Sequence, residues 1–132
     1  MLRKLFYVAI ILAVCVMYYR SILVKAQNYV DQNPQAEWAP KWQYYIGDVY
    51  FFASDYADAE KAYLQVKKKF PKSFYASRAQ FSIGRIYEEQ ENYQRAKAEY
   101  EKFVKDYPFD SFARRAKDKL DVLALFKNEN KP

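Results

Sequence analysis

Apolar residues follow two different patterns along this chain. An unbroken apolar run extends from Leu5 to Tyr19, and Arg20 interrupts it before further apolar residues follow. From about residue 40 onward, apolar positions instead recur every three or four residues, which is the spacing of one face of an α-helix. The clearest series is Tyr93, Ala96, Tyr100, Phe103, Val104 and Tyr107. The pattern predicts an all-α chain in which one apolar helix precedes several amphipathic helices.

The amphipathic part of the chain repeats itself after 37 positions, since residues 69–79 read KFPKSFYASRA and residues 106–116 read DYPFDSFARRA. The matching pairs are Ile46/Ile83, Gly47/Gly84, Tyr50/Tyr87, Tyr56/Tyr93, Ala59/Ala96, Tyr63/Tyr100, Pro71/Pro108, Ala76/Ala113, Arg78/Arg115 and Ala79/Ala116. Periods of about 20–50 residues are typical of stacked-repeat architectures. We therefore expect each copy to form a pair of helices.

Turn and cap residues mark the second helix of each pair. Asp55 and Asn92 precede that helix and have side chains suited to an N-cap. Pro71 and Pro108 follow it, and proline cannot continue a helix because it lacks the backbone N–H. The sequence therefore predicts two helical hairpins with short connections.

The chain has only two glycines, and both lie in the first helix of a predicted pair. A glycine inside a helix costs about 1 kcal/mol relative to alanine, so Gly47 and Gly84 predict a close approach of the second helix. We expect Ala59 and Ala96 to be the small residues opposite them. The large tyrosines would then fill the space between helices, with their hydroxyl groups reaching the surface.

This pattern resembles the tetratricopeptide repeat, and the resemblance covers about residues 38–126. The positions that match that family's Gly, Tyr, Ala, aromatic and Pro positions, and that we expect to hold the helices together, are Gly47, Tyr50, Ala59, Tyr63, Pro71, Gly84, Tyr87, Ala96, Tyr100 and Pro108. Gln43 and Gln80 replace the usual Trp, and the period exceeds the standard of about 34 residues. The resemblance implies a short right-handed stack of helical hairpins with two repeats and a capping helix. The Y/F-P-x-S-x-x-A link resembles that of bacterial envelope proteins, such as outer-membrane assembly lipoproteins and periplasmic cell-division coordinators.

The expected organisation has four parts. Residues 1–25 form a membrane anchor or signal-like segment, and residues 26–37 form a connecting helix and linker. The repeat domain occupies residues 38–126, with copies at about 40–73 and 77–110 and a capping helix at 110–126. Residues 127–132 form a disordered tail. A fainter copy, in which Pro34, Ala39 and Lys41 align with Pro71, Ala76 and Arg78, places residues 21–32 in the position of a preceding second helix.

Three interpretations of the N-terminal segment remain open. A retained membrane helix would run from about residue 5 to residue 24, close to the roughly 20 residues that a bilayer requires, with Arg20 near the interface. A lipoprotein signal is the second, because the residues ending at Cys15 resemble a lipobox, although Val14 departs from that motif. A cleaved signal peptide is the third. The distribution of basic residues favours a cytoplasmic N-terminus with the repeat domain outside.

Composition argues against catalysis and against metal binding. The chain has no histidine, and its single cysteine excludes a thiolate cluster. With two glycines it also lacks a phosphate-binding loop. We expect no enzymatic activity, no cofactor and no metal. Although the net charge is +6, acidic and basic residues are interleaved along the chain, so we expect no nucleic-acid binding.

The resemblance implies that proteins are the partners, bound on the face lined by the first helix of each pair. The groove residues expected from it are Lys41, Tyr44, Asp48, Phe51, Phe52, Arg78, Phe81, Arg85, Glu89 and Arg115. We expect a membrane-tethered interaction module acting as a subunit, scaffold or assembly factor of a bacterial envelope complex, in the inner membrane as a single-pass protein with a periplasmic repeat domain. The alternatives are a periplasmic outer-membrane lipoprotein in envelope assembly or cell division, lipidated at Cys15, and an N-anchored targeting receptor.

Overall fold

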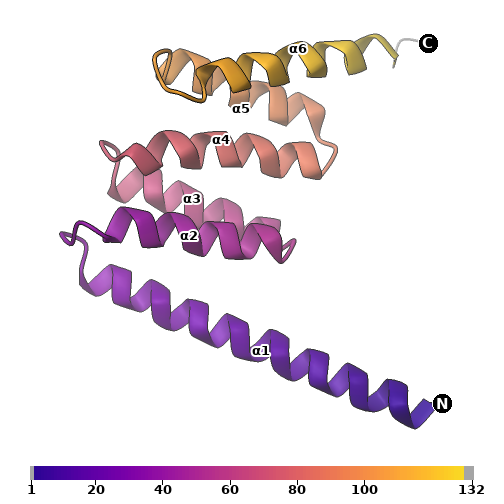
Figure 1. Ribbon diagram of the computed structural model, residues 1–132. Helices are drawn as coiled ribbons and strands as arrows, with labels where there is room; N and C mark the ends of the chain where they lie inside the picture. The colour runs from indigo at the N-terminus through magenta and orange to yellow at the C-terminus, as the bar shows by residue number, and fades with distance from the viewer. Residues whose placement is uncertain (1, 130–132) are drawn as a thin grey trace.

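Every regular element of the described chain is an α-helix (Figure 1). The computed structural model describes residues 2–129. The helices are α1 (Leu2–Gln32), α2 (Ala39–Phe52), α3 (Tyr56–Lys69), α4 (Phe74–Glu89), α5 (Tyr93–Asp106) and α6 (Ala113–Glu129). The all-α fold predicted from the periodicity is confirmed, and each sequence copy forms one hairpin, α2–α3 or α4–α5.

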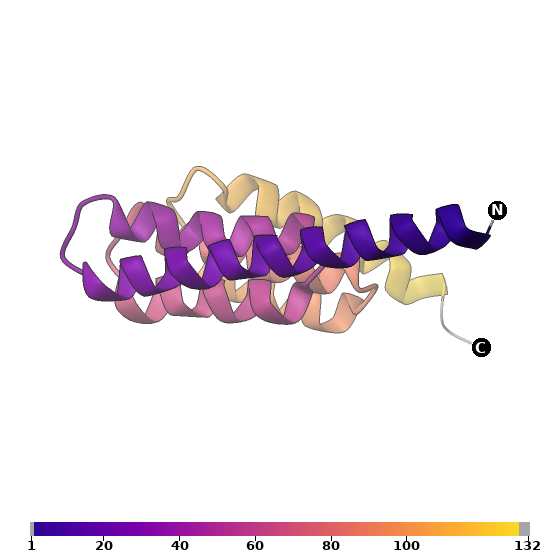
Figure 2. The same ribbon diagram turned by 90° about the horizontal axis from the view of Figure 1, so that it is seen from below.

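The helices lie side by side along a common long axis, with their connections at the two ends of the stack (Figure 2). The hairpins α2–α3 and α4–α5 stack on each other, and α6 packs on α5. The C-terminal half of α1 packs against α2, whereas its apolar N-terminal half extends past the turn between α2 and α3 (Figure 2). The described residues therefore form a stack of helices, beyond which one apolar helix extends.

The core lies between the two helices of each hairpin and between adjacent hairpins. Its largest fully buried side chains are Tyr63, Tyr100, Phe103, Ile83 and Ile86. A second, smaller apolar cluster joins α1 to the first hairpin and contains Leu23, Val30, Ala39, Ile46 and Ala62. Residues of α1 therefore form part of the folded core, which fits the expectation that residues 21–32 occupy the position of a preceding second helix.

The two glycines permit close packing, but against aromatic rings rather than alanines. A Cβ atom built on Gly47 would lie 2.6 Å from Cε1 of Tyr63, and one built on Gly84 would lie 2.6 Å from Cε1 of Tyr100. Ala59 and Ala96, which were expected to lie opposite the glycines, are fully buried without being their nearest neighbours. The tyrosine rings fill the space because each projects from the second helix across the interface.

Several predicted boundaries and caps differ in the structure. The segments expected at 1–25 and 26–37 form one continuous helix as far as Gln32, and α6 continues to Glu129. The rest of the expected tail, residues 130–132, lies outside the described residues. Asn92 caps α5, since its Oδ1 accepts a hydrogen bond of 3.2 Å from the backbone N–H of Arg95. Asp55 makes no such bond to α3, because its carboxylate binds Arg20 instead.

Candidate partner-binding surfaces

Three basic residues lie at equivalent positions in the first helix of each pair. Lys41, Arg78 and Arg115 are each separated by one period of the repeat, and they lie near the start of α2, α4 and α6. We call them the cation column. The charged group of each lies over an aromatic ring, which for Lys41 is the ring of Tyr45 at 5.8 Å. Such contacts fix a cation in place while leaving its hydrogen-bond donors available.

The two arginines of the cation column share one ring. The guanidinium of Arg78 lies 4.3 Å from the ring centre of Phe74 and 4.6 Å from that of Phe112. Arg115 lies 4.8 Å from the same Phe112 ring and 5.5 Å from that of Phe81. Phe81 is itself only 3 % exposed. Its ring therefore packs under the guanidinium of Arg115 and is not accessible to a partner.

The neighbouring predicted groove residues form a polar and aromatic layer on α2 and α4. Tyr44 is half-buried with its hydroxyl 3.1 Å from Oγ of Ser82, and Asp48 accepts a hydrogen bond of 2.7 Å from the hydroxyl of Tyr63. Burial raises the pKa of the Asp48 carboxyl above its ordinary value. Phe51 is buried beneath the guanidinium of Arg85, which lies 4.5 Å from its ring centre.

The two remaining predicted groove residues, Phe52 and Glu89, are exposed at the C-terminal ends of α2 and α4. Phe52 is 77 % exposed. The structure therefore brings basic, aromatic and acidic groups together on one face, with Phe51 and Phe81 buried under it. Among the described residues, no group of three acidic or thiol side chains is placed to hold a metal ion.

A second surface, of which sequence reasoning identified only Phe52, runs along α2. Trp42, Tyr45 and Val49 recur at helical spacing and are 50 %, 48 % and 44 % exposed. We call them, together with Phe52, the α2 stripe. One period later the first three positions are Ala79, Ser82 and Ile86, and each of these is almost completely buried.

The repeat explains that difference in burial. In the second copy, the equivalent face of α4 is covered because α2 packs against α4. In the first copy, α1 takes the place of a preceding second helix, and no described helix takes the place of a preceding first helix. The α2 stripe is therefore the open end of the stack. Comparing the two copies position by position could have identified this surface, because α2 carries more large apolar residues than its core face requires.

Two buried glutamines occupy the positions where the resembled repeat carries Trp. The side-chain amide of Gln43 exchanges hydrogen bonds of 2.8 and 2.9 Å with that of Gln27 in α1. The amide nitrogen of Gln80 donates to the backbone carbonyl and to the carboxylate of Glu99, and its oxygen accepts from Lys67. Both glutamines thus tie a first helix to the second helices around it, which is a structural role.

An ion-pair cluster fixes α1 to the first hairpin. The guanidinium of Arg20 donates hydrogen bonds of 2.7 Å to Asp55 and 2.8 Å to Asp58. A hydrophobic stretch suitable for a membrane span begins at Leu5 and overlaps this docked part, since the candidate span is Leu5–Gln32 and an 18-residue window within it has a mean hydropathy of 2.0. By length and composition α1 can cross a membrane, and Arg20 marks the point where it meets the repeat stack.

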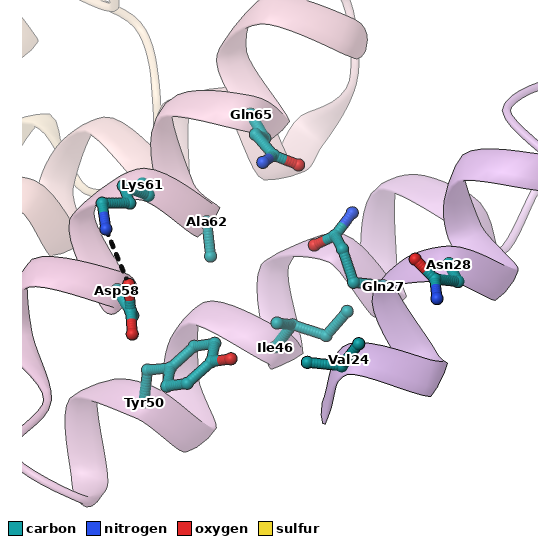
Figure 3. Close-up of a pocket in the computed structure, with 9 residues that line it drawn as sticks. All are labelled: Val24, Gln27, Asn28, Ile46, Tyr50, Asp58, Lys61, Ala62 and Gln65. Atoms are coloured by element: carbon teal, nitrogen blue, oxygen red, sulfur yellow. Dashed lines mark hydrogen bonds and ion pairs between the residues drawn. The ribbon is translucent and has the colours of Figure 1, made fainter. Parts of the chain in front are cut away.

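Between α1 and α3 lies an open pocket of about 200 Å³ (Figure 3). Its lining residues are Val24, Gln27, Asn28, Ile46, Tyr50, Asp58, Lys61, Ala62 and Gln65. The ion pair of Lys61 with Asp58, 2.9 Å long, closes one end of the pocket, and Gln27 and Gln65 lie toward the other (Figure 3). On either side of the pocket, α1 is joined to α3 by the hydrogen bond of Arg20 with Asp58 and by the ion pair of Lys69 with Asp31.

The model of the family described as tetratricopeptide repeat matches residues 44–111, which include most of α2, all of α3, α4 and α5, and the connection to α6. No curated protein matches the chain.

Proposed function

Because this chain belongs to the tetratricopeptide repeat family, whose members generally bind other proteins, we propose that it is a membrane-tethered protein-interaction module. In this proposal it serves as a subunit, scaffold or assembly factor of a complex at the bacterial inner membrane, with its repeat domain in the periplasm. Repeats of this family typically act as scaffolds and not as catalysts.

The observation that carries this proposal is the exposed α2 stripe. Trp42, Tyr45 and Val49 occupy positions that a packed helix covers in the second copy of the repeat. Contiguous exposed apolar side chains mark interaction sites in folded proteins, and aromatic residues are common anchors of binding energy. A partner helix that packs on α2 as α2 packs on α4 would complete the stack. This arrangement supports stable membership in a complex over transient capture of peptides.

The docking of α1 supports a repeat domain that sits against the bilayer. Arg20, Leu23 and Val30 all contact the first hairpin. The part of α1 left to cross a membrane is then residues 5–19, which span about 22 Å as a helix. The hydrocarbon core of a bilayer is about 30 Å thick. The segment is shorter than this core, so the turn between α2 and α3 would be held against the headgroup region, with no flexible stalk between membrane and repeats.

The same contacts favour a retained segment over a cleaved signal peptide. Cleavage near residue 26 would remove Leu23, which is 7 % exposed, and Arg20, and it would leave Asp55 and Asp58 without their hydrogen-bond donor Arg20. Lipidation at Cys15 would keep these contacts, so it remains the alternative for the anchor. The intact mass of the protein purified from membranes distinguishes the two, because a lipoprotein would start at Cys15 and carry acyl chains.

The experiment that tests the proposal is purification of the full chain from native membranes in mild detergent, with mass spectrometry of the proteins that co-elute. We expect a stoichiometric partner. The variant Val49→Arg should lose it, because the new charge lies in the middle of the α2 stripe.

The matched control is Leu64→Arg on α3. Leu64 is 47 % exposed, and the equivalent residue of the second copy, Glu101, is also exposed. It therefore faces solvent in both repeats, and the control should retain the partner. A wild-type protein that elutes alone, or equal loss of the partner in both variants, would contradict the proposal.

A further inference from the structure

We propose that the open end of the stack binds a second copy of this chain, so that two copies form a parallel dimer with two-fold symmetry in one membrane. This inference rests on the proposed interaction function and names the partner that covers the α2 stripe. In the dimer, α2 of each copy lies against α1 and α2 of the other copy.

The docked half of α1 exposes apolar side chains at positions that are buried in the repeat. In α3, the ring of Tyr63 contacts α2, and Ala59 and Val66 lie on the same helical face four residues before it and three after it. All three are fully buried. One period before Ala59 and Val66 stand Ile22 and Tyr29 of α1, and both are about half exposed. Helix α1 therefore has the face of a second helix whose own first helix is missing.

A single first helix would cover both exposed faces at this end of the stack. In the repeat, a first helix packs on the second helix of its own hairpin and on the next first helix, as α2 packs on α3 and α4. A first helix placed before α2 would therefore contact the α2 stripe and the exposed face of α1 together. Aromatic rings join these faces, since Tyr29 stacks on Trp38 at 5.1 Å and Trp38 lies 6.1 Å from Trp42. The open end is thus one continuous apolar surface.

The α2 stripe has the spacing of a helix that pairs with itself. Trp42, Tyr45, Val49 and Phe52 are separated by three, four and three residues, which is the a/d spacing of a heptad. In a parallel pair of identical helices, each of these residues lies against its own counterpart. Pairing two stripes buries no charge, because all four residues are apolar or aromatic. Each copy supplies both the exposed surface and the helix that covers it, so one contact covers both copies.

The membrane tether selects the direction of this pairing. Consecutive first helices run the same way, as α2 and α4 do, because a second helix returns the chain between them (Figure 1). A second α2 that runs in this direction is related to the first by a two-fold axis along the helices. Both α1 helices then extend from the same end of the dimer and enter one bilayer, whereas an antiparallel pair would point them in opposite directions. Insertion in one bilayer also raises the effective concentration of the copies for each other.

The first test asks whether two copies of the full chain leave the membrane together. Two forms of the chain with different C-terminal tags are co-expressed, extracted in mild detergent and purified through one tag. We expect the other tagged form to co-elute. Val49→Arg in both forms should lower its amount by at least about tenfold, because the two new charges would be buried against each other. The matched control, Leu64→Arg on the exposed side of α3, should retain it.

Disulfide cross-linking in the membrane tests the direction of the pairing without adding charge. The variants are made in a Cys15→Ser chain, so that the introduced thiol is the only one. Val49→Cys and Tyr45→Cys should each form a cross-linked dimer, because the symmetry brings equivalent Cα atoms within the roughly 4.4–6.8 Å that a disulfide spans. Leu64→Cys should remain monomeric. An antiparallel pair would place residue 45 against residue 49, so only a mixture of those two variants would cross-link.

The outcomes separate this inference from the proposed function. If an unlike protein co-elutes and is lost from Val49→Arg, while the second tagged form does not co-elute, the inference is overturned and the proposed function stands. If neither an unlike protein nor a second copy co-elutes, the proposed function is overturned as well. Cross-linking of the mixture alone, or cross-linking of Leu64→Cys as efficient as that of Val49→Cys, overturns the parallel dimer. Circular dichroism confirms that each variant is folded.

Discussion

Replacing Gly84 by alanine tests how the two helices of a hairpin approach each other. The new Cβ would lie 2.6 Å from Cε1, 2.9 Å from Cδ1 and 3.0 Å from Cζ of Tyr100, whereas carbon atoms pack at about 3.5–4.0 Å. The ring cannot easily yield, because Tyr100 is fully buried, packs on Phe81 and donates a hydrogen bond of 2.8 Å to Glu88. We therefore expect the substitution to strain the hairpin.

The expected change in the free energy of unfolding is the sum of two losses and one gain. Overpacking costs about 1–3 kcal/mol, and weakening the hydrogen bond to a charged acceptor adds about 1 kcal/mol. Alanine recovers about 1 kcal/mol of helix propensity. We expect a net loss of about 1–3 kcal/mol in the free energy of unfolding, measured by denaturant titration of the full chain in micelles and followed by circular dichroism.

Two comparisons make the result interpretable. Ala98→Gly, at an exposed position inside α5, calibrates the propensity contribution and should cost about 1 kcal/mol. Adding Tyr100→Leu to Gly84→Ala should destabilise less than the sum of the single changes, because the smaller side chain relieves the contact. If Gly84→Ala were as stable as wild type or more stable, the close packing of ring against glycine would be refuted.

Two further predictions concern charged and ionisable groups. In a double-mutant cycle of unfolding, Arg20→Gln and Asp55→Asn together should destabilise less than the sum of the two single changes, as expected for two side chains that interact; additive effects would mean that Arg20 does not hold α1 to the hairpin. Burial, and donation to Asp48 and Glu88, raise the pKa values of the Tyr63 and Tyr100 hydroxyls above their ordinary value of 10.0. The folded protein then keeps protons that the unfolded chain loses, so this contribution to stability is fully present below about pH 10 and is lost as the pH rises further. Tyr63→Phe should flatten that decline in an unfolding series at alkaline pH, and identical slopes in variant and wild type would contradict the assignment.

Sequence periodicity could predict the hairpins because a repeat imposes the same burial on equivalent positions. Tyr63 and Tyr100, one period apart, are both fully buried, as their shared position requires. The residue packed against each glycine could not be predicted in the same way. Spacing shows which face of a helix a side chain lies on. The length and rotamer of each tyrosine, which spacing does not show, bring its ring, and not Ala59 or Ala96, against the glycine.

Contacts between residues far apart in the sequence could not be predicted from the periodic pattern either. Arg20 was placed at a membrane interface because it interrupts an apolar run, and Asp55 was placed at a helix cap. Their hydrogen bond joins residues 35 positions apart, which no local signal indicates. The α2 stripe was missed for a related reason, since α2 is apolar on several sides. The stacking of α2 on α4, with no described helix in the equivalent place before α2, shows which of those sides is exposed.

The positions of the tether and the cation column together restrict the geometry of a partner. Arg20 binds beside the turn between α2 and α3, whereas Arg78 and Arg115 lie near the opposite ends of their helices. Helix α2 has 14 residues and is about 21 Å long. A membrane-embedded partner that covers the α2 stripe from this turn to the start of α2 must therefore continue about 20 Å beyond the headgroups, to the end of the stack at which the cation column lies. A partner helix of about 14 residues packed along α2 would meet this requirement.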